Sequence, residues 1–186
     1  MRRLYYAGPV RRRAVIAFDG SPWGGGAALW LDGRAADRAT LEGSDPKEFF
    51  SVAWGPAEEV LLEAPIGDSS GQARWEAYTV LLAVSTWRRL FANPVNRVIL
   101  VGDAEGVLHG AVTLHSKDPV INKVFGEVAL LIGPSGGCLK AVHYWSEDNE
   151  VADALSRSSQ GAPLPHCCRH SRRRDGGHDP WRWLGR

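Results

Sequence analysis

The chain is organised around the stretch Ala14–Trp30, AVIAFDGSPWGGGAALW. Its first five residues form an apolar run rich in β-formers, which is typical of a strand buried on both faces. Asp19 ends that run, and the turn residues Gly20-Ser21-Pro22 and Gly24-Gly25-Gly26 follow. A second apolar run begins at Ala27. The stretch therefore predicts a β-hairpin whose first strand ends in a carboxylate.

A carboxylate at the end of a buried strand is costly unless it is paired or binds a metal. Asp19 also suits a turn, because its side chain readily hydrogen-bonds the neighbouring backbone. On this stretch alone, a metal ligand and a turn cap are equally good interpretations of Asp19.

Composition and length indicate one soluble domain. The chain has 186 residues, with 44% hydrophobic and 23% charged residues. It has neither an apolar run near the ~18–20 residues of a membrane span nor the apolar core of a secretory signal at its start. Its three cysteines, Cys138, Cys167 and Cys168, do not suggest a disulfide framework. We therefore expect no membrane partner and an intracellular location, cytoplasmic or nuclear.

The net charge of +1 hides three regions of different sign. Residues 1–13 carry +5 and residues 161–186 carry +4, which leaves −8 on residues 14–160. We expect a basic N-terminal arm (1–13), a folded domain (14–160) and a basic, disordered C-terminal tail (161–186). The arms are either solvated termini or contacts for a polyanion. Zinc binding by the tail's Cys and His residues is the weaker interpretation, since their spacing matches no usual finger.

Hydrophobic patterning predicts the remaining elements. Residues 55–71 are rich in Pro and Gly and predict no regular structure, apart from a short strand at Val60–Leu62. The order is three strands, helix, strand, two helices, strand, helix, which favours a mixed sheet with an antiparallel hairpin edge. We expect strands at 48–54, 98–101 and 138–145, and helices at 72–91, 104–115, 119–132 and within 146–157.

Four acids stand at the ends of these elements: Asp19, Glu76, Asp103 and Asp153. Glu76 faces the core from the start of a helix, where the helix dipole also favours it. The strands before Asp19 and Asp103 should be neighbours, and ligands gather outside strand ends in such sheets. Clustered carboxylates repel unless cations neutralise them, and hard oxygen ligands suit Mg²⁺ or Mn²⁺. Two such ions can drive phosphodiester hydrolysis.

Four segments together resemble the ribonuclease H family, in particular the domains attached to retrotransposon reverse transcriptases. They are FDGS (18–21), RWEAYTVLLAV (74–84), VGDAEGVLHG (101–110) and DNEVADALSR (148–157). The resemblance covers about residues 14–158. It implies a ribonuclease H-like α/β fold: a mixed five-stranded sheet with antiparallel first three strands and helices on both faces.

The same resemblance implies a function. It implies endonucleolytic cleavage of the RNA strand of RNA–DNA hybrids with two Mg²⁺ ions, or Mn²⁺ in their place. Asp19, Glu76, Asp103 and Asp153 become the catalytic metal ligands, and Gly20, Ser21 and Asn149 the substrate-binding residues. The expected partners are the hybrid and a reverse transcriptase polymerase domain.

Two departures from the family leave other classes open. Only Ser-Glu-Asp separates Trp145 from Asn149, so the loop His of many cellular members is missing, and no basic handle helix is evident. A catalytically silent module that binds nucleic acid or a partner is the first alternative. A different nuclease of the same superfold is the second, and the ending from Asn149 to Arg157 argues against it.

Overall fold

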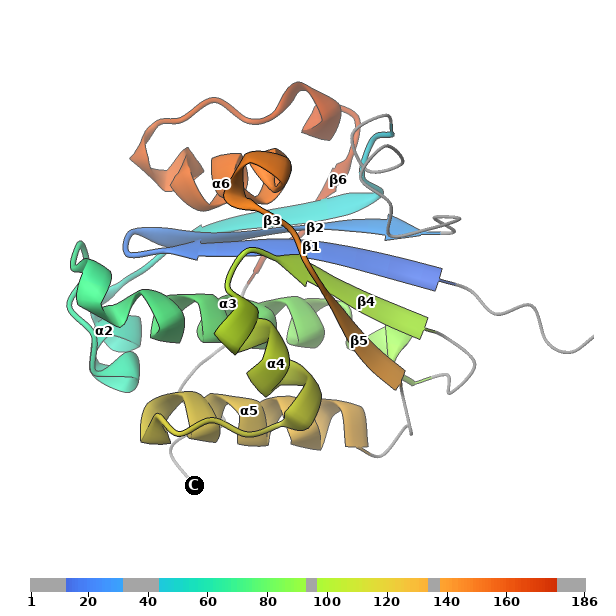
Figure 1. Cartoon of the computed structure of the whole chain (residues 1–186). Coiled ribbons are helices and arrows are strands. Elements are labelled where there is room, and N and C mark those ends of the chain that lie inside the picture. The colour runs from blue at the N-terminus through green and yellow to red at the C-terminus, as the bar shows by residue number, and fades with distance from the viewer. Residues whose placement is uncertain (1–12, 32–43, 93–96, 134–137, 177–186) are drawn as a thin grey trace, which may run out of the picture.

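A single mixed sheet organises the computed structural model, which describes residues 13–31, 44–92, 97–133 and 138–176 (Figure 1). Its strands are β1 (Arg13–Ser21), β2 (Gly24–Leu31), β3 (Glu48–Ala53), β4 (Arg97–Gly102), β5 (Cys138–His143) and β6 (Arg172–Arg173). Their order is β5-β4-β1-β2-β3-β6. The first three strands pair antiparallel, while β4 and β5 continue parallel to β1. This topology confirms the predicted mixed sheet, including the pairing of β1 with β4.

Strand β1 is buried on both faces, as its apolar run predicts. Ile16 and Phe18 belong to one hydrophobic cluster, and Val15 and Ala17 to another on the opposite face. The alternation follows the two-residue period of a strand. Asp19 continues the series of Val15 and Ala17, so its side chain faces the smaller cluster.

Helices cover both faces of the sheet (Figure 1). The helices are α2 (Pro56–Leu62), α3 (Gln72–Thr86), α4 (Glu105–Thr113), α5 (Pro119–Ile132) and α6 (Glu150–Arg157). Helices α3, α4 and α5 pack over the larger cluster, and α6 packs over the smaller one. Among the described residues, no helix is both long and apolar enough to cross a membrane.

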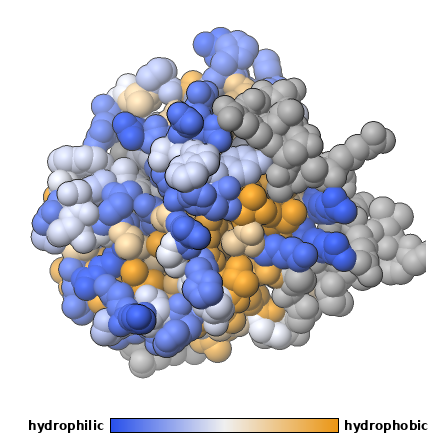
Figure 2. Space-filling model, in the orientation of Figure 1, coloured by the Kyte–Doolittle hydropathy of each residue, from blue (hydrophilic) through white to orange (hydrophobic). Residues whose placement is uncertain are grey.

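The edge strand β5 leaves apolar residues at the surface. Leu139, Ala141 and Val142 are only half-buried there. Figure 2, drawn from the same side, shows hydrophobic residues reaching the surface around this strand while hydrophilic residues cover most of the surrounding face.

The glycine run after Trp23 belongs to the sheet rather than to the turn. Gly24, Gly25 and Gly26 begin β2 and are buried. A Cβ on Gly26 would lie 2.4 Å from the Cβ of Leu155 in α6, so only glycine allows the helix to pack this closely. Asp19 pairs with Gly26 and is therefore inside β1, two residues before its end, not beyond the strand as the sequence predicts.

Two other segments also differ from the sequence-based expectations. Residues 56–62 form α2, where Pro56 occupies the first turn and Glu58 accepts a 2.9 Å hydrogen bond from the Gly55 amide. The predicted absence of regular structure in these residues is therefore wrong, and so is the short strand predicted at Val60–Leu62. Helix α3 ends at Thr86, and a 3-10 turn follows at Arg88–Leu90.

Part of the expected C-terminal tail adds a sixth strand to the sheet. Arg172 and Arg173 pair with the start of β3, and both nitrogens Nε and Nη2 of Arg174 donate to the Glu48 carboxylate at 2.8 Å. Cys168 is buried in the smaller cluster. Residues 161–176 therefore differ from the expected disordered tail, because ion pairing and burial attach them to β3. Residues 1–12 of the arm and 177–186 of the tail lie outside the described residues.

Candidate active site

Asp19 lies at the contact between β1 and α6. Only 8% of the residue is exposed, and the Ser156 hydroxyl donates a hydrogen bond to its Oδ2. Burial raises the pKa of Asp19 to about 6, against the hydrogen bond from Ser156. The negative charges of Asp103 and Asp153 raise this pKa further, and Arg157 lowers it. Asp19 is therefore close enough to Asp103 and Asp153 for their charges to affect its protonation.

Glu76 approaches the same strand end from α3. It lies in the second turn of the helix and is 6% exposed, so the helix dipole does not explain its burial. Burial raises its pKa to about 8; the hydrogen bond from Gln72 opposes this, and the charges of Asp103 and Asp19 add to it. Gln72 Nε2 donates to Glu76 Oε1 at 3.0 Å and also to the Gly20 carbonyl.

Gly20 is the point where α3 and β1 come closest. A Cβ at this position would lie 2.7 Å from the Glu76 backbone. The structure therefore gives Gly20 a packing role beside the acids. Its predicted contact with substrate stays a prediction.

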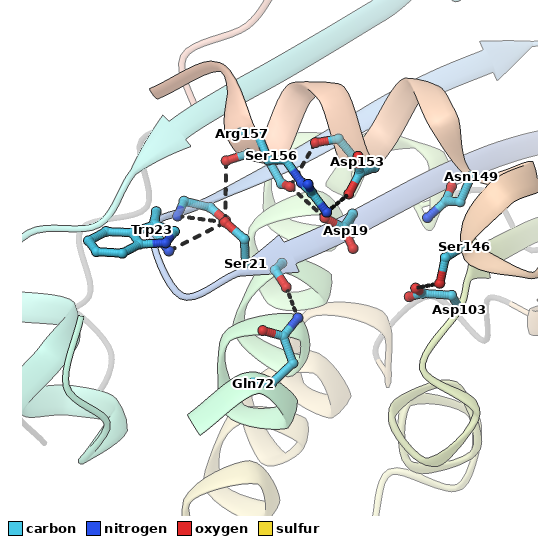
Figure 3. Close-up of polar contacts among 12 residues, drawn as sticks. Asp19, Ser21, Trp23, Gln72, Asp103, Ser146, Asn149, Asp153, Ser156 and Arg157 are labelled. Atoms are coloured by element: carbon cyan, nitrogen blue, oxygen red, sulfur yellow. Dashed lines mark hydrogen bonds and ion pairs between the residues drawn. The ribbon is translucent and has the colours of Figure 1, made fainter. Parts of the chain in front are cut away.

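Asp103 follows β4 directly and is held by the last residue of β5 and by the segment after it. Ser146 Oγ donates to Asp103 Oδ2 at 2.6 Å, and the ring nitrogen Nε2 of His143 lies 2.9 Å from the Asp103 carbonyl oxygen. Figure 3 shows Asp103 and Ser146 on one side of the site and the turn residues Ser21 and Trp23 on the other.

Asp153 projects from α6 and is 40% exposed at its side chain. Arg157, one turn later, pairs with it at 2.7 Å. Asn149, predicted to act beside Asp153, is 4% exposed, and its Nδ2 donates to the Phe18 carbonyl at 2.9 Å. The amide nitrogen of Asn149 thus attaches the start of α6 to β1.

Ser21 closes the β1–β2 turn and also reaches the site. Its hydroxyl donates to the Gly24 carbonyl at 3.0 Å and accepts hydrogen bonds from the amides of Trp23 and Gly24. A 2.7 Å bond from the Trp54 indole to the Ser21 carbonyl fixes this end of the hairpin. Ser21 is therefore held in place at the edge of the acids.

Three of the four acids line one open hollow of about 290 Å³. We call it the acid hollow; its lining residues include Asp19, Ser21, Trp23, Gln72, Asp103, Ser146, Asp153 and Arg157. Glu76 is hydrogen-bonded to the lining residue Gln72. Within the described ranges, no three His, Cys, Asp or Glu side chains are close enough together to hold one metal ion. The fold brings the acids to one place without closing them into a ligand cluster.

Sequence reasoning missed the polar residues that hold these acids. Ser156 and Arg157 stand three and four residues after Asp153, and Gln72 stands four before Glu76, so helical spacing offered a signal for each. Ser146 is 43 residues from Asp103, and no local pattern links the two.

No protein-family model matches this sequence, and no curated protein matches it either. Solved structures do match its fold. Ribonuclease H1 from the halophilic archaeon Halobacterium salinarum NRC-1 is 16% identical, with a TM-score of 0.51 over 81% of this chain and 99% of that chain. LC11-RNase H1, isolated from compost by a metagenomic approach, is 17% identical, with a TM-score of 0.55 over 79% of this chain and 94% of that chain.

A structure of LC11-RNase H1 in complex with an RNA/DNA hybrid matches with 16% identity and a TM-score of 0.50, over 78% of this chain and 94% of that chain. Identities this low establish an arrangement of elements and not an activity. The order of strands, the antiparallel first three and the helices on both faces agree with these structures. The chain therefore has a ribonuclease H-like fold.

Proposed function

We propose that this protein is a metal-dependent endonuclease that hydrolyses the RNA strand of RNA–DNA hybrids. The observation that supports this most is that Asp19, Asp103 and Asp153, from three different elements, line one open hollow, with the buried Glu76 hydrogen-bonded to its lining residue Gln72. Burying carboxylates beside one another raises their pKa values, a cost that bound cations remove. Sites of this kind are enriched among functional ones.

The donor set fits divalent cations of the magnesium type. Asp19, Glu76, Asp103 and Asp153 offer hard carboxylate oxygens, which Mg²⁺ and Mn²⁺ prefer. Asp19 and Glu76, with raised pKa values, would release protons when a cation binds. When bound, a pair of such ions supplies an activated water and stabilises the departing oxygen of a phosphodiester.

The neighbouring polar residues prepare these carboxylates. Three of the acids each accept a hydrogen bond at one carboxylate oxygen: Asp19 from Ser156, Glu76 from Gln72 and Asp103 from Ser146. The second oxygen of each carboxylate is left for a cation. Arg157 neutralises Asp153 at the open rim. We propose that its guanidinium turns to a substrate phosphate when Asp153 binds a cation.

The substrate and wider context follow from likeness. LC11-RNase H1, of similar fold, has been solved in complex with an RNA/DNA hybrid. The segments FDGS and DNEVADALSR resemble retrotransposon ribonuclease H domains. We therefore propose an RNA–DNA hybrid as the substrate and a reverse transcriptase polymerase domain as a partner.

The test is cleavage of a hybrid labelled on its RNA strand, with Mg²⁺ and then with EDTA. Wild-type protein should cut only the RNA strand and only with the metal. Asp19→Asn should abolish cleavage, while the matched control Glu105→Gln, an exposed acid outside the hollow, should cut normally. Cleavage that persists in EDTA, or that survives Asp19→Asn, would contradict the metal mechanism.

A silent nucleic-acid-binding module is the second candidate. The observation that favours it is the occupation of the acids by protein groups: Asp153 is paired with Arg157, and Ser146 and Ser156 bind two other carboxylates. Hybrid binding without cleavage in both Mg²⁺ and Mn²⁺ would select this candidate.

A further inference from the structure

The two ends of the strands form two edges of the sheet, and these edges carry opposite charge. Strands β1, β3, β4, β5 and β6 run in the same direction, so their first residues share one edge of the sheet. The acid hollow lies at the other edge, where β1 and β4 end. Six residues of β1 separate Arg13 from Asp19, a length of roughly 20 Å at about 3.3 Å per residue.

Cations gather where the strands begin. Arg13 and Arg97 open β1 and β4, and Lys47 precedes β3. Arg88 and Arg89 follow the end of α3, whose residues Ser85 and Thr86 line a hollow together with the arginines of β6. We call this surface the basic edge; its exposed cations are Arg13, Lys47, Arg88, Arg89, Arg172 and Arg173.

A polar hollow of about 320 Å³ lies within the basic edge. Its lining residues are Ser85, Thr86, Arg172, Arg173, Arg174 and Asp175. Arg174 is occupied by Glu48, which also accepts a 2.9 Å hydrogen bond from the Trp87 indole. These contacts fix β6 against α3 and hold the neighbouring arginines in place.

Arg172 and Arg173 stay available to a ligand. Both are exposed, and neither makes an ion pair within the part of the chain that the structure describes. Both arginines line the hollow, and a guanidinium group offers hydrogen-bond donors in the geometry that phosphate accepts. The chemistry of this hollow therefore suits a phosphate-bearing ligand.

Protection of a sheet edge is the ordinary reason for charged residues on an outer strand. It accounts for Arg172 and Arg173. It does not account for Arg88 and Arg89, which follow a helix, or for Lys47, which precedes β3. Protection of the outer strand therefore explains only part of the basic edge, and the remaining cations require another explanation.

We propose that the basic edge is a second nucleic-acid site, which binds the phosphodiester backbone of RNA or DNA outside the segment that occupies the acid hollow. The hollow has no aromatic lining residue, so this contact carries no base stacking and no sequence preference. In the sequence, four further arginines lie within the twelve residues before Arg13. The proposal concerns binding and does not depend on cleavage.

The test compares two double variants of the full chain that lose the same charge. Arg172→Gln/Arg173→Gln changes the basic edge, and Lys117→Gln/Lys123→Gln removes two exposed lysines around the start of α5. Binding of a fluorescent DNA duplex and of the matching RNA–DNA hybrid is measured in EDTA across a salt series. Circular dichroism and urea unfolding show that each variant is folded.

The arginine variant should bind at least about 5-fold more weakly than wild type at low salt. Its slope of log affinity against log salt should be shallower by about 1.8, since each lost phosphate contact on duplex DNA contributes about 0.9. The lysine variant should keep the wild-type slope. Equal slopes for the two variants would overturn the proposal, as would aggregation of the arginine variant with unchanged binding.

Two further measurements separate this proposal from its rivals. If polyglutamate binds wild type as tightly as the duplex does and loses affinity in the arginine variant, the edge is a site for acidic proteins and the proposal is wrong. If wild type never cleaves a hybrid but the slope difference is present, the proposed nuclease activity fails while the second site stands.

Discussion

Glu76 should make the metal-free protein less stable as the pH rises, and Glu76→Gln should remove that effect. Burial raises the pKa of Glu76 from its ordinary value of 4.5 to about 8. A carboxyl with a raised pKa in the folded state contributes its stability below its unfolded pKa and loses it as the pH climbs to the folded value. The loss therefore falls between about pH 4.5 and pH 8.

The magnitude follows from these two pKa values. Each pKa unit corresponds to about 1.4 kcal/mol, so the full effect has a ceiling of about 5 kcal/mol. Between pH 6 and pH 8, linkage gives a fall of about 2 kcal/mol in the free energy of unfolding from Glu76 alone. Asp19, with a pKa of about 6, adds about 0.4 kcal/mol over the same interval because most of its effect lies at lower pH.

The assay is urea unfolding in EDTA at pH 6, 7 and 8. Wild-type protein should lose about 2.5 kcal/mol across this range, and Glu76→Gln should lose under 1 kcal/mol, because a glutamine still accepts the hydrogen bond from Gln72 but carries no charge. Glu105→Gln, at an exposed position, should keep the wild-type slope. If wild-type stability is the same from pH 6 to pH 8, or if the stability of Glu76→Gln falls in parallel with it, the pKa of Glu76 is not raised by burial and this reasoning is refuted.

Asp19→Asn should keep its fold and unfold in EDTA at the same or higher urea concentration, because one like charge leaves the site; a clear loss of stability would instead assign Asp19 a structural role. Mg²⁺ affinity, measured by calorimetry, should rise from pH 6 to pH 8 because the cation displaces protons from Asp19 and Glu76, whereas constant affinity would contradict their role as ligands. Arg174→Met should lower the free energy of unfolding by about 1–3 kcal/mol in urea, since Glu48 is 13% exposed at its side chain and loses two charge-assisted hydrogen bonds; unchanged stability would show that β6 is not held by this pair.

Elements whose residue pattern is local could be predicted from the amino-acid sequence. The apolar run from Ala14 to Phe18 specified a strand buried on both faces, and the apolar residues from Ala77 to Val84 specified a buried helix. Each pattern repeats within a few residues, so it encodes which side of an element is buried. The same patterns put Glu76 on a buried face and Asp103 after a strand.

Features that depend on close approach between distant segments could not be predicted in this way. Nothing in the order of residues shows that Gly26 lies against α6, which makes the glycine run part of a strand instead of a turn. The ion pair of Arg174 with Glu48 joins residues 126 positions apart and converts part of an expected tail into a strand. Charge patterning indicated solvated arginines there because local composition contains no information on a distant partner.

The candidate site shows the same division. Sequence patterning located Asp19, Glu76, Asp103 and Asp153 on their elements, but the raised pKa values of Asp19 and Glu76 arise from burial and from charges that the fold brings near. The contact of Asn149 with the Phe18 carbonyl likewise forms across 131 residues. Periodicity specifies the side of an element on which a residue lies; only packing of the elements specifies which residue it meets, because that contact is set by the whole sheet and the helices that cover it.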